Sequence, residues 1–129
     1  MMLMSRALGD SADATAPDGS EVRLLVTATR GSMAHFTLGP GQVSRAVAHR
    51  SVEEVWFFTH GLGRMWRSLG QDQSILEVKA GLSVNIPPGT SFQFRCDGAE
   101  PLQAVGVTMP PWPGMDEAYE VKGLCPGRG

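Results

Sequence analysis

The segment GQVSRAVAHRSVEEVWFFTHG, residues 41–61, decides the fold of this chain. It opens and closes on a glycine, and Val47, His49 and Glu54 stand at fixed intervals between the two. Five residues separate the opening glycine from Val47, and four separate His49 from Glu54. Because glycine is the usual residue at sharp turns, we interpret the segment as two strands and their connection, held between two turns.

A second segment bounded by turn residues, GLSVNIPPGTSFQFRC, occupies residues 81–96. Five residues follow its opening glycine before Pro87, and Phe92 and Cys96 come after the next glycine. The Pro-Pro-Gly run predicts a turn between two short strands. The two segments thus repeat one pattern of turns and strands, with different side chains between the turns.

The rest of the chain favours strands as well. Short stretches of strand-like composition alternate with turn signals such as Gly-Pro-Gly and Asp-Gly, and no convincing amphipathic helix interrupts them. Many short strands with regular turns predict an all-β sandwich or barrel. The expected strands are residues 21–28, 32–38, 43–49, 54–59, 63–68, 73–79, 83–86, 91–95 and 102–109.

The spacing in both segments resembles the two motifs of the cupin superfamily. The first cupin motif carries two histidines and a glutamate, and the second carries a third histidine and usually an asparagine. Matched by position, His49 and Glu54 stand where metal ligands would be, whereas Val47, Phe92 and Cys96 replace the first histidine, the last histidine and the asparagine. The resemblance implies a double-stranded β-helix, the cupin-type jelly-roll barrel.

The same match argues against a resident metal ion. A catalytic zinc site generally has three protein ligands, and non-haem iron uses two histidines and a carboxylate. Val47 and Phe92 remove donors and add apolar bulk where the ion would sit, so we expect no metal and no other cofactor. The open alternative is a metal-dependent dioxygenase or isomerase that uses His49 and Glu54 with a further ligand such as His35.

Side chains alternate along a strand, so the faces that carry His49 and Glu54 can be followed to their neighbours. The resemblance implies that these faces look into the barrel, where they would line a small, mostly apolar cavity. His49 and Glu54 are the predicted catalytic pair, because an imidazole beside a carboxyl group can transfer protons. Arg45 would anchor an anionic ligand. The predicted ligand-binding residues are Arg45, Trp56, Phe58, Phe92 and Phe94.

These expectations lead to a function hypothesis. The chain is interpreted as a small-molecule-binding cupin-like protein, and the resemblance implies a metal-independent isomerase or epimerase acting on a small polar or acidic metabolite. Two alternatives stay open: the metal-dependent enzyme, and a non-catalytic ligand-binding or sensor module. The fold alone does not identify the ligand.

Composition narrows the partners and the domain organisation. The 129 residues carry a formal net charge of −2 and fit one domain. Without a basic field, a nucleic-acid partner is not expected, and no apolar run approaches the roughly 20 residues of a membrane helix. We expect a flexible arm at residues 1–20 and a single barrel domain at residues 21–129 with a Pro/Gly-rich tail.

The oligomeric state and the cellular location are predicted from the resemblance, the N-terminal arm and the cysteines. The resemblance implies a homodimer, and the long arm could add to a partner's sheet edge. The two cysteines, Cys96 and Cys125, form no close pair, which is typical of reduced thiols in a cytoplasmic protein.

Overall fold

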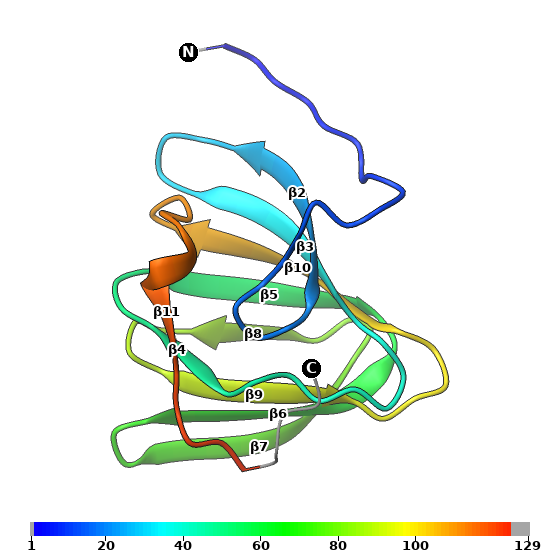
Figure 1. The fold of residues 1–129 in the computed structure, drawn as a ribbon, viewed down its shortest axis with the longest axis vertical. Coiled ribbons are helices and arrows are strands. Elements are labelled where there is room, and N and C mark those ends of the chain that lie inside the picture. The colour runs from blue at the N-terminus through cyan, green and yellow to red at the C-terminus, as the bar shows by residue number, and fades with distance from the viewer. Residues whose placement is uncertain (1, 125–129) are drawn as a thin grey trace.

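The computed structural model describes residues 2–124 and arranges them in two antiparallel β-sheets (Figure 1). The first sheet has the strand order β1-β2-β3-β10-β5-β8 and the second has the order β11-β4-β9-β6-β7. The strands are β1 (Ala14–Thr15), β2 (Glu21–Thr27), β3 (Ser32–Leu38), β4 (Val47–His49), β5 (Glu53–His60), β6 (Leu62–Leu69), β7 (Asp72–Lys79), β8 (Ser83–Ile86), β9 (Ser91–Cys96), β10 (Leu102–Met109) and β11 (Ala118–Glu120).

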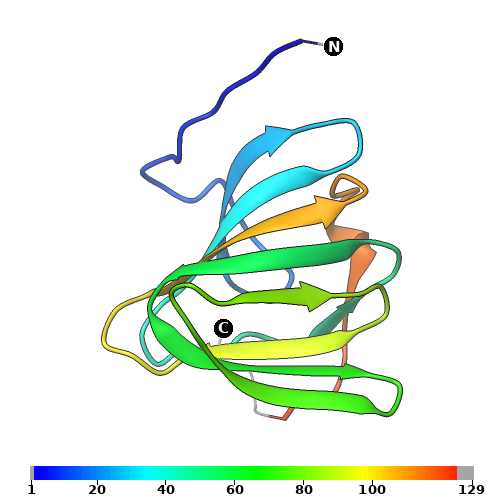
Figure 2. The same cartoon turned by 180° about the vertical axis from the view of Figure 1, so that it is seen from behind.

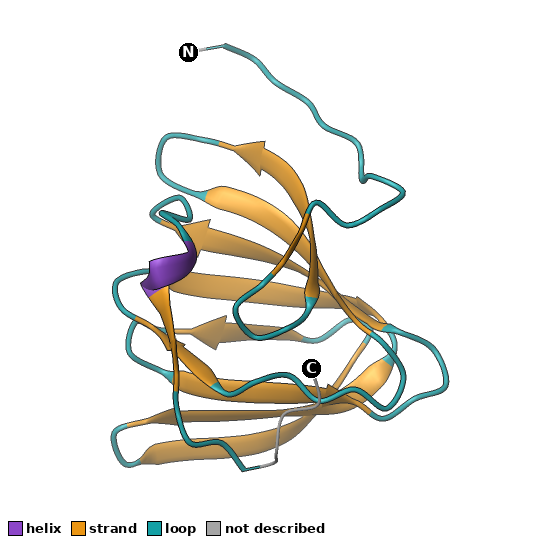
Figure 3. Ribbon diagram, viewed as in Figure 1, coloured by secondary structure: helices purple, strands orange, loops and turns teal. Residues whose placement is uncertain are grey.

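Neighbouring strands in these sheets are often distant in the sequence. β3 pairs with β10, β4 pairs with β9, and β10 also pairs with β5, which places it inside the first sheet (Figure 2). Such long connections between antiparallel strands characterise the jelly-roll family of barrels. The all-β prediction is confirmed, and the described chain has a single helical turn, η1 (Met115–Glu117), at one end of the barrel (Figure 3).

Most predicted strands are confirmed to within two residues at either end, but the strand predicted at residues 43–49 is regular only over β4. The side chain of Ser44 explains the difference. Its Oγ accepts the Phe94 N–H at 3.0 Å, so a hydroxyl takes the place of a backbone carbonyl in the ladder. The next residue, Arg45, donates its backbone N–H to Asp18 O at 2.7 Å instead of to β9. The register against β9 shifts by one residue between the Val43–Arg95 bridge and the Val47–Phe92 pair, so the chain has a β-bulge, and bends, before it enters β4.

The core lies between the inner faces of the two sheets. Burial alternates along β5, where Glu54, Trp56 and Phe58 are buried and the residues between them are exposed. This confirms the predicted face of β5. The buried cluster joins residues of both sheets: Leu38, Val47, Trp56, Phe58, Met65, Val78, Val84, Ile86, Phe92, Phe94, Cys96, Leu102 and Ala104.

Both terminal segments contact the barrel. Residues 2–13 are exposed (Figure 1), although Gly9, Asp10 and Asp13 are hydrogen-bonded to β2, whereas Asp18 and Ser20 are buried. The last part of the predicted arm therefore belongs to the packed structure, while its flexibility and the domain boundary stay predictions. The C-terminal segment adds β11 to the edge of the second sheet, beside β4. Cys125 lies outside the described residues.

Within residues 2–124, no helix is long and apolar enough to cross a membrane.

Gly106, on β10, makes the packing of two cavity-lining aromatic rings testable. Phe36 and Trp56 stack at 4.9 Å between ring centroids. A methyl group on Gly106 would lie 2.9 Å from Phe36 Cε2 and 2.9 Å from Trp56 Cδ1. Gly106→Ala should therefore lower the free energy of unfolding by about 1–3 kcal/mol, measured by urea denaturation followed through tryptophan fluorescence.

Gly98→Ala is the matched control, because the nearest atom to its added methyl group, Leu62 Cβ, is at an ordinary 3.6 Å. Equal unfolding free energies for the two variants would contradict the tight packing at Gly106.

Candidate functional site

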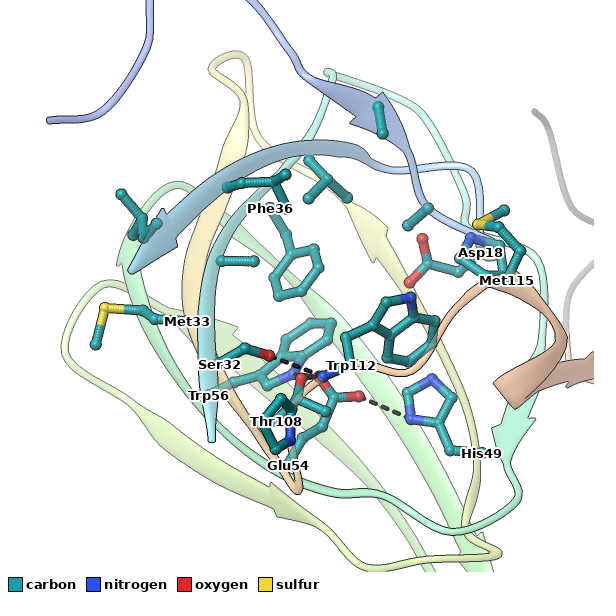
Figure 4. A pocket seen from close by; sticks show the side chains of 18 of the residues that line it. Asp18, Ser32, Met33, Phe36, His49, Glu54, Trp56, Thr108, Trp112 and Met115 are labelled. Carbon is teal, nitrogen blue, oxygen red and sulfur yellow. Dashed lines mark hydrogen bonds and ion pairs between the residues drawn. The ribbon is translucent and has the colours of Figure 1, made fainter. Parts of the chain in front are cut away.

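The structure brings the predicted pair His49 and Glu54 together inside the barrel. His49 ends β4 in one sheet and Glu54 lies on β5 in the other. Nδ1 of His49 is 2.8 Å from Oε2 of Glu54, and the two side chains are 6% and 3% exposed (Figure 4). The pair therefore links the two sheets at a position shielded from bulk water.

The second carboxylate oxygen of Glu54 is held by two neutral donors. Trp56 Nε1 and Thr108 Oγ1 each donate to Oε1 at 3.2 Å. Thr108 lies on β10 directly opposite Glu54 in the strand register, so the two side chains share a face. With both oxygens engaged, the carboxylate has a fixed orientation toward His49. Thr108 could not be identified from the sequence, because its strand was predicted but the pairing of that strand with β5 was not.

Aromatic side chains hold the His49 ring from two sides. Phe92 and Trp112 make edge contacts with it, at centroid distances of 5.3 Å and 5.2 Å. Nδ1 is turned to Glu54, and Nε2 lies on the other side of the ring, toward the cavity (Figure 4). Trp112 could not be identified from the sequence, because it lies in the Pro-rich tail. Outside a strand, alternation does not predict which way a side chain points.

These residues line a cavity of about 380 Å³, within the range of small-molecule pockets. The lining is mostly apolar. Its polar side chains are few, and they include Asp18, His49, Glu54 and Thr108. The barrel interior is thus not completely filled by its aromatic residues.

The predicted ligand-binding residues fall into three groups. Trp56 and Phe92 line the cavity. Phe58 and Phe94 do not, and belong to the hydrophobic core. Arg45 is turned away because of the bend before β4: its Nη1 donates to Pro17 O at 3.3 Å, and its Nε lies 3.9 Å from Glu120 Oε1. Arg45 therefore has no place in this cavity.

Asp18 is a cavity residue that sequence reasoning missed. It is 5% exposed, and its Oδ1 accepts hydrogen bonds from Ser20 N at 2.9 Å and Ser20 Oγ at 2.6 Å. Burial raises the pKa of this carboxyl group, and the Ser20 hydrogen bonds offset the effect only in part. The sequence around it, Pro-Asp-Gly-Ser, has the composition of a turn in the predicted arm. That this turn lines the cavity is visible only in the folded structure.

The donor set does not fit a cupin-type metal centre. Val47 and Phe92, at the positions of two missing histidines, are buried apolar side chains. Residues 2–124 contain no cluster of three or more His, Cys, Asp or Glu that could hold a metal ion. His35 is buried on β3 but does not line the cavity, although its neighbours Ala34 and Phe36 do. Burial, aided by the charge of Arg23, lowers the His35 pKa.

Three solved structures define the class of this fold. The chain superposes on an uncharacterized conserved protein with a double-stranded β-helix domain from Klebsiella pneumoniae, with a TM-score of 0.66 and 16% identity over 92% of this chain and 91% of that one. Bacillus subtilis oxalate decarboxylase gives a TM-score of 0.71 and 15% identity, over 87% and 30% of the two chains. CapF, solved with 3-isopropenyl-tropolone, gives 0.66 and 16%, over 81% and 32%.

These likenesses establish a double-stranded β-helix. More particularly, the fold is that of the cupins, so the predicted resemblance is confirmed at the level of the fold. The chain spans about a third of the length of the oxalate decarboxylase and CapF chains. No family model and no curated protein matches the sequence.

Glu117 fixes the connection between His49 and Glu54. Its carboxylate accepts Ser51 N at 2.6 Å, Ser51 Oγ at 2.7 Å and Val52 N at 3.0 Å. Burial alone would raise the pKa of Glu117, but these hydrogen bonds outweigh it and lower the pKa below the usual 4.5. Glu117 thus attaches η1 to the β4–β5 connection. The cavity residue Met115 is part of η1, and Trp112 precedes it.

Glu117→Gln should lower the free energy of unfolding at pH 7 by about 1–3 kcal/mol, because the amide satisfies fewer of the three donors. A carboxylate with a depressed pKa stabilises the fold above its unfolded pKa, and the contribution is lost as the pH falls through the folded pKa. The difference between wild type and variant should therefore shrink between pH 5 and pH 3, measured by urea denaturation.

Glu120→Gln, on exposed β11, is the control and should show little difference at any pH. A Glu117→Gln deficit that is independent of pH would contradict the role of the ionised carboxylate.

Proposed function

We propose that the cavity binds a small polar metabolite and transforms it by proton transfer at His49, as a metal-independent isomerase or epimerase. The observation that carries this proposal is the orientation of His49. Its Nδ1 lies 2.8 Å from Oε2 of the buried Glu54 carboxylate, and the ring lines a cavity large enough for a metabolite. This is how a general base is arranged to receive a proton from a bound molecule.

Each member of the pair has a distinct task in this mechanism. In this mechanism Glu54, whose Oε2 lies 2.8 Å from Nδ1, holds a proton on that nitrogen, which leaves the lone pair of Nε2 for the ligand. When Nε2 takes a proton from a carbon next to a carbonyl group, the Glu54 carboxylate stabilises the imidazolium that forms. The imidazolium exchanges its proton with solvent and then protonates a neighbouring carbon of the enolate, or the opposite face of the same carbon once the enolate has turned over in the cavity. The cycle is balanced without a co-reactant.

The apolar lining supports this chemistry. Phe36, Trp56, Phe92 and Trp112 limit the water around the reacting atoms, which strengthens electrostatic interactions within the cavity. Trp56 also donates to Glu54, so one residue contributes both to the wall and to the position of the carboxylate. Homodimer formation and a cytoplasmic location remain predictions from the sequence.

Proton exchange from solvent tests the proposal. Small aldoses, ketoses, hydroxy acids and amino acids are incubated with the protein in D2O, and loss of a C–H signal is followed by ¹H NMR. Any compound that exchanges with the wild type should exchange about 10²–10⁴ times more slowly with His49→Gln and Glu54→Gln.

His60→Gln is the matched control, since His60 is exposed and bonds only to Thr59 Oγ1, at 3.0 Å, among the described residues. Wild-type exchange by a folded His49→Gln variant would refute proton transfer at His49. Ligand binding without any exchange would favour a non-catalytic binding module.

A further inference from the structure

Among the described residues that line the cavity, carboxyl groups outnumber guanidinium and ammonium groups. Asp18 and Glu54 both line it and both are at least 95% buried, with His49 as the only imidazole in the lining. Arg6 is the one basic side chain among the described lining residues. It is half exposed and lies 3.5 Å from Asp13. Among the described residues, Arg6 is thus the one guanidinium or ammonium group that borders the cavity, and it does so from a half-exposed position.

Asp18 has one carboxylate oxygen available to a ligand. Both hydrogen bonds from Ser20 go to Oδ1, and Oδ2 takes part in no hydrogen bond or ion pair within residues 2–124. The carboxyl group points into the cavity (Figure 4). In Glu54, by contrast, both oxygens are already used by His49, Trp56 and Thr108. Asp18 is thus the acidic group that a ligand can contact directly.

The aromatic rings around these carboxyl groups suit the same kind of ligand. Phe36, Trp56 and Phe92 line the cavity from three strands, and Trp112 lines it from the segment between β10 and η1. An aromatic face attracts a cation electrostatically, most strongly in tryptophan and where water is excluded. Buried carboxyl groups beside several aromatic rings therefore form an environment that favours positive charge.

We propose that the ligand of this cavity is a small organic cation, an amine or quaternary ammonium compound, held by Asp18 Oδ2 and the aromatic wall. This assignment rests on the proposed function of the cavity and gives it a ligand class. The cationic group binds at Asp18, and the carbon that loses its proton faces His49 Nε2. A cation also favours the ionised form of Asp18, which burial opposes in the empty cavity.

An acidic ligand has no comparable partner here. A carboxylate or phosphate would enter a cavity that already holds two carboxyl groups, and Arg45, the predicted anchor, lies outside. The like charges would repel at short range, and burial would increase the repulsion. The sequence predicted a small polar or acidic ligand, and we replace the acidic ligand with a cationic one.

Three isosteric probes test the charge preference. Choline, its neutral carbon analogue 3,3-dimethylbutan-1-ol, and 3,3-dimethylbutanoate are titrated into the full chain at one ionic strength by isothermal calorimetry. Choline should bind on the order of tenfold more tightly than the neutral analogue, and the carboxylate should bind most weakly.

Two variants and a control locate the effect. Asp18→Asn keeps the shape and the oxygen that accepts from Ser20, and should reduce the preference for choline while raising the melting temperature of the ligand-free protein, because a buried acid is removed. Trp112→Leu should reduce the same preference without changing charge. Glu53→Gln, an exposed neighbour of Glu54, should leave it unchanged.

The outcomes separate this inference from the proposed function. Equal binding of choline and the neutral analogue, or tighter binding of the carboxylate, overturns the cation assignment while leaving the cavity as a binding site. Failure of all three probes to bind overturns it as well, and the exchange experiment with His49→Gln then decides the proposed function separately. An unchanged choline preference in both Asp18→Asn and Trp112→Leu also overturns it.

Discussion

The contact between His49 Nδ1 and Glu54 Oε2 is the interaction on which the site depends. It joins β4 to β5, and so one sheet to the other, in an interior where an unpaired carboxylate would be costly. Trp56 and Thr108 satisfy the remaining oxygen, so the carboxylate is fixed at both ends. Because Glu54 is held in this way, its Oε2 faces Nδ1 of His49, and the proposed proton transfer uses the other ring nitrogen, Nε2.

The two ends of the chain complete a site that the central strands begin. The loop carrying Asp18 enters from the N-terminal side, fixed by its backbone bond to Arg45, and Trp112 enters from the C-terminal side. Glu117 attaches the latter segment to the connection between His49 and Glu54. The barrel has apolar side chains, Val47 and Phe92, at two of the matched donor positions, and residues from outside the two motifs enclose the polar pair His49 and Glu54.

Turn residues and alternation are local signals, and they predicted an all-β sandwich or barrel and most of its strands. The jelly-roll barrel and the position of His49 and Glu54 inside it were implied by the resemblance to the cupin motifs. The sequence did not predict the bend at Ser44, where a side-chain hydroxyl replaces a ladder partner, and therefore misplaced Arg45. To identify Thr108 as a partner of Glu54, the register of β10 against β5 must be known. To place Asp18 and Trp112 in the cavity, the paths of their loops must be known. Such long-range features follow from the packed fold and have no local periodicity.

The most direct test of the central claim is the tautomer of neutral His49, measured by two-bond ¹H–¹⁵N NMR correlation in the wild type and in Glu54→Gln. The account predicts the Nδ1–H tautomer in the wild type, with Nε2 unprotonated and available to the cavity, and a changed tautomer balance in the variant. An Nε2–H tautomer in the wild type, or identical spectra for His49 in both proteins, would contradict it.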